Sequence, residues 1–372
     1  NTERIAEVIR EALGRADAVI LTGGLGPTQD DVTREALAAV ARVRLVRSPE
    51  LEAWLRGRFA RMSIQRMAEM NLRQADVPEG ARTIDNPRGT APGLIMELDG
   101  KPAYAVPGVP REMEGMLEQV VLPDLAVRAG EGRAIVSRTL RTAGVGESRL
   151  AEQLTPLWEA AGAGQVTMAY LASAGEVRVR LTAVGATREE ALAEIAPVES
   201  TIRESLGDIV YGIDDETLEA VVGRVLRERG LTMATAESLT AGLLGGRIAS
   251  IAGASDYYLG GVVAYATDAK ASQLGVDPAL LEAEGPVSEP VAAAMAAGVR
   301  KVFGADLGLA ATGVAGPTEQ SGRPVGTLCL GVADAAGTTT RTLTAPGDRT
   351  QVRLWTCTVA LDLARRRLQG LA

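Results

Sequence analysis

Two side chains in the last third of the chain can form a nucleophile and its base. Ser238 lies shortly after a predicted strand and near the start of a predicted helix, and Lys270 lies near the start of another predicted helix. The chain contains no histidine, which excludes Ser-His-Asp and Cys-His catalytic sites within it. The base must then be a lysine or a carboxylate, and a lysine can accept a serine proton when burial or nearby positive charge lowers its pKa. Ser238 and Lys270 are therefore the candidate catalytic pair.

Three more polar residues in this region follow strand ends or precede a helix. Tyr265 ends one predicted strand, Thr312 follows another, and Arg349 comes just before the last predicted helix. Arg349 is always charged, so it can bind a substrate phosphate and lower the pKa of Lys270. Together these positions favour one convergent site. Taken singly, Ser238 is more often a helix N-cap, and Lys270 more often a solvated helix residue.

A glycine-rich loop near the start of the chain is a candidate phosphate site. It follows the apolar run Asp17–Leu21, which predicts a buried strand. Glycines after a strand let backbone N–H groups approach a phosphate, and the following helix end favours an anion. The alternative is an ordinary tight turn. The candidate ligand-binding residues are Gly23, Gly24, Gly26 and Thr28.

Acidic residues close to this loop are candidate ligands for a divalent metal ion. Asp30 and Asp31 end the loop, and two adjacent carboxylates suit a cation that bridges to a phosphate. Pro107 and Gly108 follow a second predicted strand, where ligands bind in open α/β sheets, and Glu112 begins the next helix. The alternatives are an N-cap for the aspartates and, equally, a helix-dipole partner for Glu112.

The first 125 residues predict an α/β domain. Its predicted helices cover 2–14, 30–43, 50–75 and 111–121, and its predicted strands cover 17–21, 94–98 and 103–106. Asp99-Gly100 between the last two strands predicts a β-hairpin. Such a domain should open with a strand, and none precedes Asn1. We therefore expect the chain to start inside this domain, with the first strand absent.

Two further domains are predicted after residue 125. Residues 126–214 predict a small α+β module, with strands at 135–142, 177–183 and 208–211 and helices from 148 and at 187–206. Residues 215–372 predict a second α/β domain. Its helices are expected at 216–229, from about 238, at 268–284, 288–303 and 350–368, and its strands at 232–235, 260–265, 307–311, 326–332 and 338–343.

Composition excludes several classes of protein. The net charge is −8, which argues against a general nucleic-acid or anionic-membrane partner. No apolar run approaches the ~18 residues of a transmembrane helix, and no signal peptide opens the chain. Two cysteines, Cys329 and Cys357, fit a reducing compartment. We expect a cytoplasmic protein that binds neither membranes nor nucleic acid directly.

Three segments of the first domain resemble the CinA proteins. They are TGGLGPTQDDVT at 22–33, NPRGTAPG at 86–93 and PGVPREM at 107–113. The resemblance implies a domain similar to molybdopterin-binding domains, with ADP-ribose pyrophosphatase activity and a divalent cation of the Mg, Mn or Co class. It also implies a KH-like middle module. The turn Gly144-Val145-Gly146-Glu147 lacks the spacing and the basic neighbours of an RNA-binding KH loop.

The last domain resembles the CinA C-terminal domain, whose stand-alone relatives are nicotinamide mononucleotide deamidases. The resemblance implies Ser238 as nucleophile and Lys270 as its partner, with no cofactor. The family more often has Cys-Thr-Gly after the serine, where Leu239-Thr240-Ala241 stands here, and Ser-Asn after the tyrosine, where Ala266-Thr267 stands. The implied substrate-binding residues are Thr240, Gly242, Tyr265, Thr312, Gly313, Gly316 and Arg349.

The resemblance predicts a bifunctional enzyme of pyridine-nucleotide recycling. One domain would deamidate nicotinamide mononucleotide, and the other would hydrolyse ADP-ribose to AMP and ribose 5-phosphate. We expect these small nucleotides as partners, and a homodimer. The alternative is a first domain that binds molybdopterin or a nucleotide without catalysis, with a competence or DNA-damage role through other partners.

Overall fold

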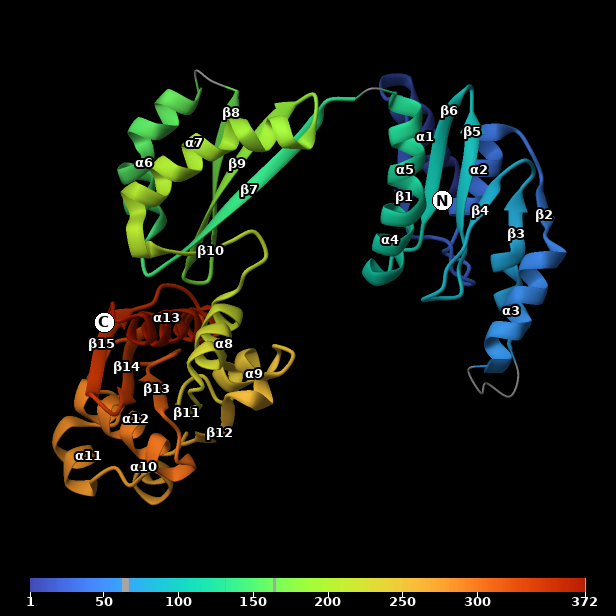
Figure 1. Cartoon of the computed structure of the whole chain (residues 1–372). Helices are drawn as coiled ribbons and strands as arrows, with labels where there is room; N and C mark the ends of the chain where they lie inside the picture. The colour runs from blue at the N-terminus through green and yellow to red at the C-terminus, as the bar shows by residue number, and fades with distance from the viewer. Residues whose placement is uncertain (62–66, 131, 163–164, 372) are drawn as a thin grey trace. The chain divides into compact units, whose positions relative to one another are not determined.

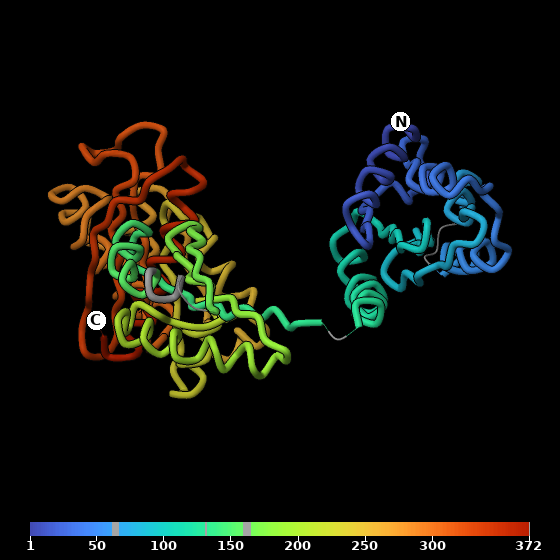
Figure 2. The backbone as a smooth tube through the Cα atoms, turned by 90° about the horizontal axis from the view of Figure 1, so that it is seen from above, coloured from blue at the N-terminus to red at the C-terminus, as the bar shows by residue number. Residues whose placement is uncertain are grey.

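The computed structural model describes residues 1–61, 67–130, 132–162 and 165–371. The chain divides into two compact units, Asn1–Gly132 and Arg133–Ala372. Each unit can be followed by its colour in Figure 2, unit 1 from blue to green and unit 2 from green to red. No described helix is both long enough and apolar enough to cross a membrane.

A four-stranded mixed sheet forms the centre of unit 1 (Figure 1). Its order is β1-β6-β5-β4, with β1 parallel to β6 and the other neighbours antiparallel. The strands are β1 (Val19–Thr22), β4 (Arg82–Ile84), β5 (Gly93–Leu98) and β6 (Lys101–Val106). β5 and β6 form the predicted hairpin, and Asp99 and Gly100 between them both have positive φ, 51° and 81°. This backbone matches a two-residue hairpin turn.

Helices pack on both faces of this sheet. They are α1 (Thr2–Arg15) and α2 (Thr33–Ala41) in one core, and α4 (Pro110–Met116), the π-helical segment η2 (Leu117–Val121) and α5 (Leu122–Ala129) in the other. Ile9 and Leu37 pack with Leu94 on the first face, and Met116 packs with Tyr104 on the second. The predicted α/β class is confirmed.

Three predicted helices of unit 1 differ from the structure. The helical segment expected at 111–121 continues through α4, η2 and α5 to Ala129. The helix expected at 30–43 begins at Thr33, because Asp31 closes the preceding loop. The helix expected at 50–75 is divided into α3 (Pro49–Arg61) and the 3-10 helix η1 (Glu69–Ala75), and residues 62–66 lie outside the described part. A short ladder joins β2 (Leu45–Arg47) and β3 (Asp76–Pro78).

The first part of unit 2 is the predicted α+β module. Its antiparallel sheet has the order β10-β7-β9-β8, and α6 and α7 pack against it. The elements are β7 (Ala134–Ala143), α6 (Glu147–Gly162), β8 (Val166–Ser173), β9 (Glu176–Gly185), α7 (Arg188–Leu206), the 3-10 turn η3 (Gly207–Ile209) and β10 (Val210–Ile213). The strand β8 was not predicted. The predicted strand at 208–211 begins two residues later, because residues 207–209 form η3.

A five-stranded sheet of order β12-β11-β13-β14-β15 forms the centre of the remaining part. β11, β12 and β13 are parallel, and β14 and β15 continue the sheet in antiparallel pairs. The strands are β11 (Met233–Glu237), β12 (Tyr258–Val263), β13 (Leu307–Gly313), β14 (Thr327–Asp334) and β15 (Gly337–Thr344). The three parallel strands end at the same edge of the sheet, where a ligand site is expected.

Two helical layers cover this sheet (Figure 1). One hydrophobic core includes α8 (Leu218–Arg229), α9 (Leu243–Ala249) and α13 (Arg349–Gln369). The other core includes α10 (Thr267–Leu274), α11 (Pro278–Glu284) and α12 (Glu289–Phe303). The 3-10 turn η4 (Ala254–Asp256) precedes β12. Cys329 in β14 and Cys357 in α13 are both buried and free. The helix predicted from about Ser238 begins only at Leu243, because 238–242 form a separate turn.

Candidate active site

The ends of the parallel strands in the second sheet bring Ser238, Lys270 and Thr312 together. Ser238 directly follows β11, and Thr312 is the second-last residue of β13. Lys270 belongs to α10, which follows β12. The register pairs Glu237 with both Val263 and Ala311, so these strands end level with one another. The sequence placed these residues on separate elements, and the parallel pairing explains why they meet.

The amino group of Lys270 contacts the hydroxyl of Ser238. Lys270 Nζ donates a hydrogen bond to Ser238 Oγ at 3.1 Å and another to the carbonyl oxygen of Ala264 at 3.2 Å. Lys270 is 2% exposed and Ser238 is 8% exposed. Burial lowers the pKa of Lys270 to about 8. A lysine with this pKa has a neutral fraction near neutral pH, and the lone pair of the neutral amine can accept the serine proton.

This pair lines a cavity of about 240 Å³. The cavity wall also includes Tyr265, Thr312 and Arg349. The hydroxyl of Thr312 donates to the carbonyl oxygen of Pro286 at 2.8 Å, which fixes the side chain while leaving an acceptor oxygen. A small cavity with hydroxyl, amino and guanidinium groups suits a polar, anionic ligand.

Arg349 lies at the exposed side of the cavity. Its guanidinium donates to the hydroxyl of Tyr265 and to the carbonyl oxygen of Gly316, both at 2.6 Å. We expected Arg349 to lower the pKa of Lys270, but burial causes that shift. Arg349 therefore stands as a candidate ligand-binding group and not as the residue that tunes the base.

The turn after Ser238 is held by a buried carboxylate. Glu237 is 2% exposed, and its carboxylate accepts hydrogen bonds from the backbone N–H groups of Gly242 at 2.8 Å, Leu244 at 3.1 Å and Gly245 at 2.8 Å. These are the N–H groups at the start of α9. N–H groups at a helix start could stabilise a reaction oxyanion, but Glu237 already occupies these three.

The same turn is held from its other side by Arg353 of α13. Arg353 Nε donates to the carbonyl oxygen of Leu239, and Arg353 Nη2 donates to that of Thr240, both at 2.9 Å. Ser238 itself is anchored to the sheet, since its N–H donates to the carbonyl oxygen of Ala311 at 2.9 Å. The nucleophile therefore lies in a turn with three independent anchors.

A second candidate site lies in unit 1, where two loops meet at the ends of β1 and β6. The N–H of Gly23 donates to the carbonyl oxygen of Val106 at 2.8 Å, and a Cβ added to Gly108 would lie 3.4 Å from the Cα of Gly23. Gly24 has φ of +68°, and an added Cβ would meet the hydroxyl of Thr33 at 2.3 Å. The close approach of the two loops thus depends on glycine.

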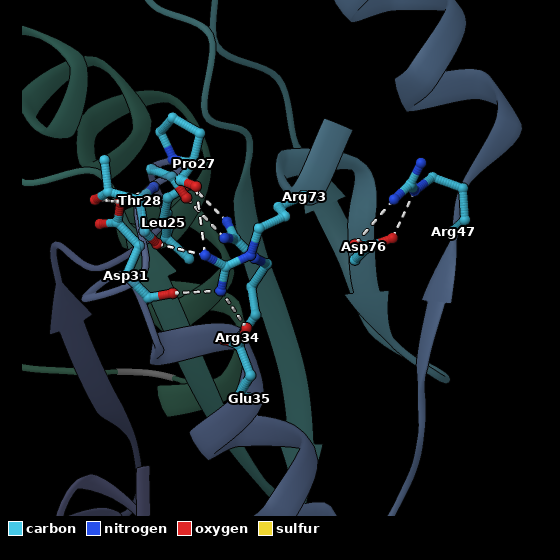
Figure 3. A network of polar contacts seen from close by, with 10 residues as sticks. Leu25, Pro27, Thr28, Asp31, Arg34, Glu35, Arg47, Arg73 and Asp76 are labelled. Atoms are coloured by element: carbon cyan, nitrogen blue, oxygen red, sulfur yellow. Dashed lines mark hydrogen bonds and ion pairs between the residues drawn. The ribbon is translucent and has the colours of Figure 1, made fainter. Parts of the chain in front are cut away.

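Two arginines hold the carbonyl groups of the glycine loop (Figure 3). Arg34, which is 2% exposed, donates to the carbonyl oxygens of Leu25 and Gly26 at 2.5 and 2.7 Å. Arg73 donates to that of Thr28 at 2.5 Å. These bonds fix the path of the loop but leave few N–H groups for an anion. Pro27, which follows Gly26, has no N–H, and the N–H groups of Gly26 and Thr28 bond to the Asp31 carboxylate. Anion binding by this loop stays a prediction.

The acidic residues near this loop do not form a three-ligand metal site. Asp31 accepts hydrogen bonds from the N–H and the hydroxyl of Thr28 at 2.9 and 2.6 Å, and Glu112 accepts one from the amide of Asn86 at 2.7 Å. Burial by itself would raise the pKa of Asp31, but the hydrogen bonds from Thr28 lower it overall. Within the described ranges, no three acidic or cysteine side chains gather closely enough to hold a metal ion, and Asp30 is exposed.

Three family models match successive parts of the chain. A probable molybdopterin binding domain matches residues 1–127, the damage-inducible protein CinA KH domain matches 137–212, and the CinA C-terminal domain matches 215–368. A CinA-like protein of Frankia casuarinae is 53% identical over 374 residues, which cover 99% of this chain and 86% of that protein. The chain belongs to the CinA family.

Other CinA relatives match over similar lengths. A protein of Moorella thermoacetica that carries the name competence-damage inducible protein is 45% identical over 371 residues, covering 100% of this chain and 89% of that one. A solved structure of a CinA superfamily protein from Enterobacter cloacae is 30% identical and covers 42% of this chain and 95% of its own, with a TM-score of 0.40. The family models and the two full-length relatives confirm the predicted resemblance to CinA proteins.

The predicted ligand residues of this CinA chain separate into two groups. Gly313 and Gly316 line the cavity beside Ser238, as do the side chains described above. Thr240 and Gly242 do not line it: Thr240 is fully buried, and the N–H of Gly242 is bonded to Glu237. In unit 1, Gly23 and Gly108 face each other, while Thr28 and Asp31 bond to one another within the loop, and Pro107 directly follows β6.

Sequence reasoning missed the two residues that hold the nucleophile turn. Glu237 stands next to Ser238, and an acidic residue between a strand and a helix start is a detectable signal for a helix N-terminal partner. Arg353 stands four residues after Arg349, so the two arginines lie one turn apart on the same helix. Nothing in the sequence indicates that the second one reaches back to residues 239 and 240.

Proposed function

We propose that the C-terminal domain hydrolyses the carboxamide of nicotinamide mononucleotide to nicotinate mononucleotide and ammonia. The observation that supports it is the contact between Lys270 Nζ and Ser238 Oγ, at 3.1 Å, in a buried pair beside a polar cavity. The resemblance to the deamidases supplies the substrate. The pair itself supports attack on a carbonyl carbon by an activated serine.

The first half-reaction forms an ester with Ser238. The oxygen of Ser238 bonds to the carboxamide carbon, and its proton passes to the neutral amine of Lys270. The tetrahedral oxyanion then collapses, the bond between carbon and nitrogen breaks, and the Lys270 ammonium gives the proton to the leaving nitrogen. Ammonia departs, and the nicotinate carbonyl remains attached to Ser238.

The second half-reaction releases the acid. A water molecule bonds to the ester carbon and gives one proton to the amine of Lys270. The bond to the serine oxygen breaks, and Lys270 returns the proton to Ser238. The product is the carboxylic acid, which ionises at neutral pH, and the enzyme recovers its starting protonation state.

Arg349 is the proposed phosphate ligand in this reaction. The guanidinium lies at the exposed side of the cavity and already donates to two oxygen acceptors, the hydroxyl of Tyr265 and the carbonyl of Gly316. A phosphate presents stronger acceptors for the same planar donor group. Thr312 lines the cavity beside Ser238 and is proposed to contact the ribose or phosphate.

Ammonia release from nicotinamide mononucleotide by the purified chain tests this proposal. Ser238→Ala, Lys270→Ala and the double variant should each lose at least about 1,000-fold in kcat, by similar factors, because residues that act as a unit are not additive. Losses that multiply in the double variant would contradict a Ser238–Lys270 unit. So would a Ser238→Ala enzyme that turns over at nearly the wild-type rate.

As a second function, we propose that unit 1 binds ADP-ribose and hydrolyses it to AMP and ribose 5-phosphate. The supporting observation is the close approach of the Gly23 and Gly108 loops at the ends of two parallel strands, with Arg34 and Arg73 behind one loop. The family resemblance implies a divalent cation for this reaction. Asp30, Asp31 and Glu112 do not form a three-ligand site, so we assign no step to a cation.

AMP release from ADP-ribose distinguishes this activity from a binding module. The assay is run with EDTA and then with added Mg²⁺, Mn²⁺ or Co²⁺. Release of AMP under any of these conditions supports hydrolysis. If ADP-ribose binds without any release of AMP, unit 1 is a nucleotide-binding module instead.

A further inference from the structure

The backbone donors of the turn after Ser238 are nearly all in use. In the described turn from Ser238 to Gly245, six of the eight N–H groups donate to an acceptor within the domain. Three go to Glu237, one to the carbonyl of Ala311 and two to carbonyls inside the turn itself. The two N–H groups in this turn without a described acceptor are those of Leu239 and Thr240.

These two N–H groups come directly after the nucleophile. An N–H of the residue that follows a nucleophilic serine is well placed for the oxyanion that forms when the serine attacks a carbonyl, as in other serine hydrolases. Leu239 lines the same cavity as Ser238. The turn therefore offers two donors directly after the nucleophile, one of them on a residue that lines the cavity.

The direction of both N–H groups is fixed by bonds to the carbonyls of their own peptide units. The Thr240 N–H shares a peptide with the Leu239 carbonyl, which accepts from Arg353 Nε at 2.9 Å. The Leu239 N–H shares a peptide with the Ser238 carbonyl, which accepts from the N–H of Ala241 at 3.1 Å. In a planar trans peptide the C=O and N–H point in opposite directions, so each bond also orients an N–H.

We infer that Leu239 and Thr240 N–H form the oxyanion hole of the Ser238 site, and that Arg353 is the positioning residue that orients it. Arg353 also donates to the Thr240 carbonyl at 2.9 Å, so its guanidinium holds two consecutive peptides of the turn. Its positive charge lies behind these peptides and stabilises negative charge on their other side. The inference rests on the proposed serine chemistry but not on the identity of the substrate.

Arg353→Met removes the two guanidinium donors that hold the turn. Arg353→Lys keeps the positive charge but loses the planar pair of N–H donors. Arg367→Met is the matched control, because Arg367 belongs to the same helix and binds Asp334 and the Gly337 carbonyl, away from the turn. Thermal unfolding of all three variants measures the structural cost. Loss of one oxyanion donor typically costs about 100- to 1,000-fold in rate, so a misoriented pair should cost at least about 10-fold.

The first measurement is the rate at which a fluorophosphonate labels Ser238. In this reaction the serine oxygen bonds to phosphorus, its proton passes to Lys270, fluoride leaves, and the phosphoryl oxygen occupies the oxyanion hole. We expect Arg353→Met to be labelled at least about 10-fold more slowly than wild type, Arg353→Lys to fall between them, and Arg367→Met to match wild type. Equal rates in Arg353→Met and wild type, or a wild-type serine that is not labelled, would overturn the inference.

The second measurement is steady-state hydrolysis of nicotinamide mononucleotide. A role in the oxyanion hole lowers kcat while KM changes by less than about threefold, because the contact forms only in the transition state. A change in KM alone would overturn the inference. Wild-type protein that reacts with the fluorophosphonate but releases no ammonia would refute the proposed substrate while leaving the role of Arg353 standing.

Discussion

Lys270 keeps its amino group in a place where an ammonium ion is poorly solvated. Its pKa of about 8 predicts that kcat/KM for the deamidation rises about tenfold per pH unit below pH 7.5 and reaches a plateau above about pH 8.5, because only the neutral amine accepts the Ser238 proton. Initial rates between pH 6 and 9.5 test this. A profile that stays flat across this range would exclude Lys270 as the base.

The same burial predicts that the base destabilises the fold. The folded pKa of Lys270, about 8, lies below the 10.5 of an ordinary lysine, so the unfolded chain binds more protons between these values, and stability rises with pH across that window. The loss of folding stability caused by burying the Lys270 ammonium is fully present below about pH 8. We expect Lys270→Met to be inactive but more stable at pH 7 by about 1–2 kcal/mol.

Urea unfolding at pH 7 and at pH 9.5 measures the difference in stability between Lys270→Met and wild type. The advantage of Lys270→Met over wild type should shrink at the higher pH. Lys301 of α12 supplies the control, because it is exposed, and Lys301→Met should change stability by less than about 0.5 kcal/mol at either pH. A Lys270→Met protein that is less stable than wild type at pH 7 would contradict the argument.

A substitution of Arg349 tests whether the cavity binds the phosphate of the substrate. Arg349→Lys keeps the charge but loses the planar pair of donors, so we expect KM for nicotinamide mononucleotide to rise about 10-fold. Nicotinamide riboside, which lacks the phosphate, should be a poor substrate of wild type and be little affected by the substitution. Equal losses on both substrates would place Arg349 away from the phosphate.

At the level of elements, the β5–β6 hairpin depends on a backbone that favours glycine. Gly100 has φ of +81°, and an added Cβ would meet no atom within 4 Å. Gly100→Ala therefore isolates backbone strain, and we expect it to destabilise unit 1 by about 1 kcal/mol in urea unfolding. Asp99→Asn is the control, since asparagine tolerates positive φ and should be nearly neutral. An alanine variant as stable as wild type would contradict this account of the turn.

The elements that were predicted correctly are those with a strong local signal. Asp99-Gly100 between two apolar runs predicted a hairpin that the structure confirms, and the alternation at 177–183 predicted β9. The start of α9 was wrong by five residues, because the turn from Ser238 to Gly242 is set by Glu237 and Arg353, which act through space. β8 was missed because its sequence, VTMAYLAS, lacks the strict alternation of β9.

The candidate catalytic pair could be predicted from sequence, but the contacts that hold the turn around Ser238 could not. The absence of histidine leaves a lysine as the natural partner of Ser238, and strand ends indicate where both residues meet. The carbonyls that Arg353 contacts lie 113 and 114 positions away. Sequence spacing carries no trace of such a contact, since it depends on how α13 packs against the sheet.

At the level of the whole molecule, the two sites belong to different units and should fail separately. Asp31 bonds to Thr28 within its loop, whereas Asp30 is exposed. If Asp31 shapes the loop, Asp31→Asn should lower ADP-ribose hydrolysis about 10-fold and Asp30→Asn should not. Neither substitution should alter ammonia release, because the Ser238 site lies in unit 2. Both reactions are measured on the same protein preparation.

The outcome also distinguishes two roles for these aspartates. If both carboxylates bind a cation, both substitutions should abolish metal-dependent hydrolysis and weaken cation affinity. If the proposed activity resides in the loop backbone, only Asp31→Asn should have an effect, and it should persist at every concentration of metal. A loss of ammonia release in either variant would show that the two activities are not independent.

The burial of both cysteines predicts how this protein responds to oxidants and to reagents that modify thiols. Burial raises the pKa of Cys329, and it raises the pKa of Cys357 to about 12, so neither thiol forms the reactive thiolate at ordinary pH. If, as proposed, this protein hydrolyses an amide through the Ser238 oxygen, it has no sulfur at its reacting centre. Iodoacetamide, glutathione disulfide and mild peroxide, which silence thiol-dependent amidases, should leave its turnover intact. Such an enzyme would continue to recycle its substrate through an episode of oxidative stress.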